Sequence, residues 1–220
     1  MKIVLDGMGG DFAPANVVAG LSLALKRSRD LEVFLVGIPE KLRLFLQEHN
    51  LENDPRIEIV PASQVVMMED APAVCLRSKR DSSITVGSRL LKEKKAQTLV
   101  SAGHTGATVA ATVVQNRTIP GIERPGIATR IPHEHGFFVL IDVGANPDSK
   151  PLHLAQYALL GQAYAKLCLG ISHPRTGILS VGEEDHKGNE LVRDTRPILE
   201  RLPLDNFIGN VEGKHLFSGQ

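Results

Sequence analysis

Short apolar runs and longer amphipathic runs alternate along most of the chain. The apolar runs, such as Ile3–Leu5 and Leu31–Val36, are rich in Val, Ile, Leu and Phe, with Glu32 the one charged residue in the second, and are typical of strands buried on both faces. The longer runs carry apolar residues at helical spacing, most clearly in segment 14–27, which ends on basic residues. This alternation predicts an α/β fold, a mostly parallel open sheet with helices on both faces in a three-layer sandwich.

The expected elements follow one another with short connections, and we expect them to form a single α/β domain over residues 1–220. The expected strands are Ile3–Leu5, Leu31–Val36, Ile57–Val60, Thr98–Ser101, Phe137–Val143, Ile178–Val181 and a segment from Phe207. The expected helices begin near Pro14, at Pro39, after Ser82 or Ser83, after Gly106, at Pro151 and after Asn189. Segment 61–81 is expected to be irregular, and the proline-bearing segment 117–135 to be loop or a short excursion.

Composition narrows the classes of protein. Lys+Arg 25 against Asp+Glu 25 gives no net charge, and 42% hydrophobic with 23% charged residues is typical of a globular protein. Without a basic surplus, and with no Trp, the chain is not expected to bind nucleic acid. The two cysteines are far apart and indicate a reducing, cytoplasmic location. The uncharged stretch 96–116 contains glycine, histidine and threonines, so it is not expected to span a membrane.

Glycine-bearing turns follow four of the expected strands, after Leu5, Ser101, Val143 and Val181, and each begins a helix. In a parallel sheet these turns lie at the carboxyl edge, where α/β proteins bind ligands. Backbone N–H groups at helix N-termini attract anions. The pattern therefore predicts a phosphate or carboxylate ligand at this edge.

Several familiar motifs are absent. The first glycine turn lacks the third glycine of the dinucleotide-binding pattern, and Lys187-Gly188 has the reverse order of the ATP-binding loop. No serine lies in a G-x-S-x-G turn. His133 and His135 are two residues apart, whereas a helical zinc pair needs four. No metal and no cofactor are expected.

Six groups of residues, in order along the chain, resemble one family. They are Asp6–Pro14, Asp70–Pro72 with Lys79–Ser83, Ser101–Ala107, Asp142–Asn146, Gly182–Glu184 with Lys187–Glu190, and Phe207–Gly213. Together they are similar to the bacterial phosphate acyltransferases of phospholipid synthesis. The chain departs from that family at His104, where the family carries Asn, and in its length, since family members continue further. The resemblance implies that this domain lacks the C-terminal third.

The resemblance implies an enzyme that converts acyl carrier protein thioester and inorganic phosphate into acyl phosphate, which feeds phosphatidic acid synthesis. Bound phosphate would attack the thioester directly, so no serine or cysteine nucleophile is needed and the site supplies positioning and oxyanion donors. The implied partners are the acyl carrier protein, phosphate, a second copy in a homodimer and a membrane glycerol-phosphate acyltransferase. The implied location is the cytoplasm, with peripheral association at the inner face of the membrane.

The candidate site residues form three groups. The catalytic candidates are Lys187, Asn189 and His104; the phosphate-binding candidates are Gly9, Gly10, Ser101, Gly103, Thr105 and Gly106; and the candidates for carrier-protein contact are Arg77, Lys79 and Arg80. Structural interpretations stay open beside these roles. The glycines could simply form tight turns, His104 could cap a helix, and Lys187 and the basic cluster could be solvated charges.

Two other functions stay open. One is a phosphotransacetylase-like enzyme that uses acyl-coenzyme A. The other is a truncated chain that only binds a partner enzyme. On the reading that a C-terminal third is missing, the isolated chain is expected to fold poorly or to associate through the uncovered strand after Phe207, and to have little activity.

Overall fold

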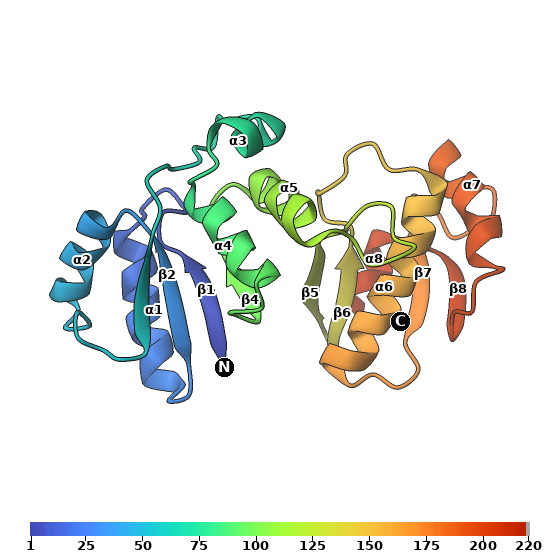
Figure 1. Ribbon diagram of the computed structural model, residues 1–220. Helices are drawn as coiled ribbons and strands as arrows, with labels where there is room; N and C mark the ends of the chain where they lie inside the picture. Colours follow the sequence, from blue (N-terminus) through green and yellow to red (C-terminus); the bar gives the residue numbers. More distant parts are fainter. Residues whose placement is uncertain (219–220) are drawn as a thin grey trace. The chain divides into compact units, whose positions relative to one another are not determined.

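The computed structural model describes residues 1–218, and the chain divides after Arg117 into two compact units, each described below by itself. The first unit contains, in chain order, β1 (Lys2–Asp6), α1 (Ala15–Arg27), β2 (Glu32–Gly37), α2 (Pro39–Glu48), β3 (Ile57–Pro61), α3 (Pro72–Ser78), α4 (Ser83–Lys92), β4 (Thr98–Val100) and α5 (Thr105–Asn116) (Figure 1). The second contains β5 (Ala128–His133), β6 (Gly136–Ile141), α6 (Pro151–Leu169), β7 (Arg175–Leu179), α7 (Glu190–Leu199), β8 (Asn206–Val211) and α8 (Gly213–Ser218). The single domain expected over 1–220 stays a prediction.

The first unit is built on a four-stranded sheet in the order β3-β2-β1-β4, in which every neighbouring pair is parallel. Side chains of β2 alternate between its faces. Val33 and Leu35 point into one apolar cluster, and Phe34 and Val36 into another. All four are buried, which is why β2 contains no polar residue between Val33 and Val36.

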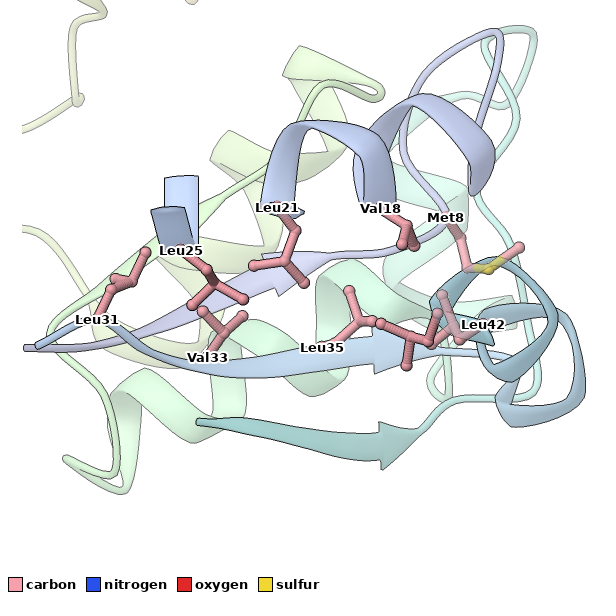
Figure 2. Packing of buried hydrophobic residues seen from close by; sticks show 9 residues of the cluster. Met8, Val18, Leu21, Leu25, Leu31, Val33, Leu35 and Leu42 are labelled. Atoms are coloured by element: carbon pink, nitrogen blue, oxygen red, sulfur yellow. The ribbon is translucent and has the colours of Figure 1, made fainter. Parts of the chain in front are cut away.

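Helices cover both faces of this sheet. On one face, Val18 and Leu21 of α1 and Leu42 of α2 pack against β2 (Figure 2). On the other face, Val86 and Leu90 of α4 pack against the opposite side chains. Each such buried aliphatic side chain contributes about 1.5–3 kcal/mol of transfer free energy. The helix–sheet–helix layers confirm the α/β fold with mostly parallel pairing.

The second unit contains two smaller sheets, a parallel pair β7–β8 and an antiparallel pair β5–β6. Ala155 of α6 and Val192 and Leu199 of α7 form a cluster with Ile178 of β7. A cavity of about 560 Å³ lies within this unit, lined mostly by apolar side chains of β6, β7 and α6.

Three expectations from the sequence were wrong. Segment 117–135 contains a strand, β5, paired antiparallel with β6 from Ala128↔Ile141 to His133↔Gly136. Pro132 obscured it, although proline is tolerated at an edge strand. Because β6 pairs with β5, the strand expected at 137–143 belongs to an antiparallel hairpin and not to a parallel sheet. Segment 61–81 contains the short helix α3, which begins at Pro72 and packs against α5.

Candidate functional site

The glycine turns after β1 and β4 lie side by side. β1 and β4 are parallel neighbours, with Leu5 opposite Val100, so both turns leave the same edge of the sheet. A Cβ atom on Gly103 would lie 2.9 Å from the Gly9 Cα, and one on Gly9 would lie 2.9 Å from the Gly103 nitrogen. Only glycine at both positions allows the two backbones to approach this closely.

A buried carboxylate fastens the two turns together. Asp6 is 1% exposed; its Oδ1 accepts the Met8 N–H at 3.1 Å and its Oδ2 accepts the Ser101 hydroxyl at 2.7 Å. The Ser101 Oγ in turn accepts the Gly103 N–H at 3.1 Å. The one hydroxyl proton of Ser101 is thus directed to Asp6, and this side chain holds the turn rather than offering a proton to a ligand. Sequence reasoning missed Asp6, although an acid directly at a strand's end was a usable signal.

Backbone N–H groups remain available around these turns. Within residues 1–218, the amides of Gly9, Gly10, Thr105 and Gly106 donate no hydrogen bond. Gly10 has φ +108°, a backbone conformation that favours glycine, and Thr105 and Gly106 begin α5, whose N-terminus carries partial positive charge. Such a group of free donors can bind a phosphate-sized anion.

His104 caps α5. Its Nδ1 accepts the Ala107 N–H at 3.3 Å, and its Nε2 lies 2.9 Å from the Asp70 carbonyl oxygen. Since Nδ1 accepts, Nε2 carries the proton and donates it to that carbonyl. Both ring nitrogens are therefore engaged in holding the Asp70 segment against the helix.

The basic residues in and after α3 differ in whether their charge is paired. Lys79 forms an ion pair with the Asp70 carboxylate and donates to the Val65 carbonyl at 2.8 Å. The hydrogen bond from Lys79 lowers the pKa of Asp70, and the Met67 N–H adds to this effect. Arg77 and Arg80, in contrast, are exposed and have no ion-pair partner in the described chain. Lys79 therefore stabilises its own loop, and only the two arginines present free positive charge.

Gly106 has a packing role as well. A Cβ atom there would lie 2.8 Å from Pro72 Cγ, so glycine lets α3 approach the first turn of α5. This close approach accounts for Gly106 whether or not its amide binds an anion.

The remaining candidates lie in the second unit. Lys187 is exposed in the loop between β7 and α7. Asn189 caps α7, because its Oδ1 accepts the Val192 N–H at 3.0 Å. The structure thus places Gly9, Gly10, Ser101, Gly103, Thr105 and Gly106 together in the first unit, with His104 beside them, and Lys187 with Asn189 in the second.

The four glycine turns do not all belong to one sheet. Those after β1 and β4 do, but the turns after β6 and β7 belong to two other sheets. The turn after β6 is fixed by Asp142. Burial would raise the pKa of this carboxyl, but hydrogen bonds from the backbone N–H groups of Ile127, Ala145 and Asn146 outweigh it, and the pKa is lowered.

Among residues 1–218, no group of three or more His, Cys, Asp or Glu side chains is placed to hold a metal ion. None of the helices in that part of the chain is long and apolar enough to cross a membrane.

Comparison with known proteins identifies relatives over the whole chain. A family model described as "Fatty acid synthesis protein" matches residues 1–220. The phosphate acyltransferase of Desulfitobacterium hafniense strain Y51 is 49% identical over 220 residues, which are 100% of this chain and 64% of the relative. That of Syntrophomonas wolfei is 43% identical over 221 residues, covering 100% of this chain and 69% of the relative. This chain therefore spans about two thirds of the length of these relatives.

A solved structure shares the fold. The EutD phosphotransacetylase from Staphylococcus aureus superposes with a TM-score of 0.62 at 20% sequence identity, covering 91% of this chain and 64% of that one. At this identity the likeness concerns the fold alone. The match to the family model over every residue, with the extensive identity to the relatives, shows that the chain belongs to the fatty acid synthesis protein family, with the phosphate acyltransferases.

Proposed function

We propose that the chain forms acyl phosphate from the acyl thioester of acyl carrier protein and inorganic phosphate. The observation that carries the proposal is the contact between the β1 and β4 turns, where unoccupied backbone amides surround Gly9 and Gly103. The family supports it, because relatives that match the whole chain bear the name phosphate acyltransferase.

The proposed reaction is a direct displacement. A phosphate oxygen attacks the thioester carbonyl carbon, the new C–O bond forms, and the C–S bond breaks to release the carrier's thiolate. The proton of hydrogen phosphate passes to that thiolate, so charge and atoms balance. Because phosphate is already anionic at neutral pH, the protein has only to position it and to stabilise the oxyanion of the tetrahedral intermediate.

The candidate residues fit these two tasks in different ways. The amides of Gly9 and Gly10 and those at the start of α5 are proposed to hold phosphate. Lys187 is proposed to neutralise the phosphate or the oxyanion. His104 and Asn189 support the site as helix caps, and Ser101 through its bond to Asp6.

The exposed arginines Arg77 and Arg80 are proposed to attract the acidic carrier protein. The homodimer, the contact with a membrane glycerol-phosphate acyltransferase and the cytoplasmic location at the inner face of the membrane are further proposals, supported by the family resemblance alone.

Phosphate titration by calorimetry tests the site. A side chain at Gly10 would strain the backbone and lie 3.3 Å from the Ala102 carbonyl oxygen, so Gly10→Val should abolish saturable binding. Gly20→Val is the matched control, since no atom lies within 4 Å of a Cβ at Gly20. Saturable binding unchanged in Gly10→Val would place phosphate elsewhere. The reaction itself is tested by supplying phosphate with thioesters of acyl carrier protein or of coenzyme A; turnover of coenzyme A thioesters alone would favour the phosphotransacetylase-like alternative.

A further inference from the structure

Lys187 lies in a strongly acidic loop and yet has no acidic partner. Glu183, Glu184 and Asp185 precede it within four residues. These acids are close enough in sequence to compete for the Lys187 ammonium, although an exposed pair of this kind contributes little free energy. Among residues 1–218, however, no hydrogen bond or ion pair engages the side chain of Lys187.

Two of the three acids are bound by basic side chains from other elements. Asp185 Oδ1 lies 2.7 Å from Nη2 of Arg196, in α7, and Glu183 Oε1 lies 2.9 Å from Nδ1 of His215, in α8. Both acids thereby have a partner other than Lys187, while their side chains, 79% and 57% exposed, stay at the surface with Lys187.

The third acid is held through its backbone. The Glu184 carbonyl accepts a hydrogen bond from Asn210 Nδ2 at 2.8 Å and another from the Lys187 N–H at 2.9 Å. Its carboxylate lies beside Gly182, where a Cβ would be 2.9 Å from Glu184 Oε2 and 2.9 Å from Lys187 Cγ, so glycine leaves room for both side chains. The loop is therefore fixed at three consecutive residues.

The Arg196 guanidinium lies beside Gly209 of β8. Gly209, with φ +80°, leaves room for it, since a Cβ there would lie 3.3 Å from Arg196 Nη1. The Arg196 side chain is 18% exposed; its other ion-pair partner is Glu200, at 3.0 Å from Nε. The Asp185 side chain is 79% exposed, so solvent screens its pair with this mostly buried guanidinium.

We propose that Arg196 and His215 are positioning residues: they hold Asp185 and Glu183 away from Lys187, so that the Lys187 ammonium remains available to an oxyanion such as phosphate. The identity of the oxyanion as phosphate rests on the proposed function. The arrangement of the charged side chains around Lys187 does not depend on it. If Arg196 loses its charge, Asp185 becomes free to pair with Lys187, two residues away. Removing the Asp185 charge as well takes away that competitor.

The test is a double-mutant cycle at these two positions, read out by the rate at which acetic anhydride labels Lys187, with and without inorganic phosphate. Arg196→Gln should slow labelling and weaken phosphate protection by about twofold to fivefold, the size of one exposed ion pair. Arg196→Gln with Asp185→Asn should restore both toward the wild-type values. Arg201→Gln, which removes an exposed charge with no partner in the described residues, is the control.

The restoration separates positioning from a merely structural role. If Arg196 only stabilised the fold, the double variant would be no better than Arg196→Gln, and that result would overturn the inference, as would unchanged labelling in the single variant. His215→Asn with Glu183→Gln gives a second cycle should Arg196→Gln not fold. The proposed function can fail independently of this inference. If labelling changes across the variants as expected but the protein forms no acyl phosphate, the positioning role stands and the proposed reaction is rejected.

Discussion

Asp6 and Ser101 connect two strands that are distant in sequence but neighbours in the sheet. Their hydrogen bond, at 2.7 Å, is the only side-chain link between the turns proposed to bind phosphate among residues 1–218. A buried carboxylate is costly unless its oxygens are satisfied, so the Ser101 hydroxyl contributes both to stability and to the shape of the site.

Ser101→Ala is therefore expected to destabilise the protein by about 1–3 kcal/mol, because it leaves Asp6 and the Gly103 N–H each short of a partner. Urea unfolding measures this. Ser78→Ala serves as the control, since the exposed Ser78 hydroxyl bonds only to a helix carbonyl, and it should change stability far less. An equal change in the free energy of unfolding for both substitutions would show that the hydrogen bond between Ser101 and Asp6 contributes no special stability.

Lys187 gives the sharpest kinetic expectation. Lys187→Ala should lower kcat/KM for acyl phosphate formation by roughly 10²-fold, the scale of losing one electrostatic donor. Lys187→Arg should recover only part of the loss, because a planar guanidinium does not replace a compact ammonium. An alanine variant with wild-type kinetics and fold would remove Lys187 from the site.

Asp142 gives an expectation for pH. Its pKa is lowered in the folded protein below the ordinary value of 3.8, so its stabilising contribution is present above that value and is lost as the pH falls through the lowered pKa. Asp142→Asn should therefore destabilise the protein at pH 7, and the difference from wild type should shrink at pH 3. Thermal unfolding at both pH values checks this; a difference independent of pH would assign the effect to shape rather than charge.

At the scale of elements, the sequence predicted the helices and strands that are marked by residues within or next to them. As expected, α6 begins at Pro151 and the Ser82 side chain caps α4. β5 and α3 were missed, because β5 depends on its pairing with β6 and α3 on its packing against α5. The glycine turns proposed to bind an anion were located from glycine spacing. The hydrogen bond between Asp6 and Ser101 and the pairing of Lys79 with Asp70 depend on contacts between residues distant in sequence.

Strand pairing predicts where backbone amides are protected. β1 and β2 each pair on both sides, whereas β6 and β7 each pair on one side in the described residues and line the cavity of the second unit. Amide hydrogen exchange should therefore be slower in β1 and β2 than in β6 and β7 by at least tenfold, if these strands open locally. Equal protection would mean that the free edges of β6 and β7 are covered in solution.

At the scale of the molecule, the residues proposed for the reaction belong to both units. Free backbone donors lie beside Gly9 and Gly103 in the first unit, and Lys187 belongs to the second. The homodimer that the family resemblance implies also belongs to this scale and stays a prediction. Size-exclusion chromatography tests it.

The most direct measurement is the trapping of acyl phosphate with hydroxylamine, in the protein as its gene encodes it, supplied with acyl carrier protein thioester and inorganic phosphate. We expect an acyl hydroxamate whose formation requires both substrates and falls to background in Gly10→Val, while Gly20→Val retains it. Absence of any phosphate-dependent hydroxamate from the folded protein would be evidence against the proposed reaction, and full formation in Gly10→Val would be evidence against the proposed phosphate site.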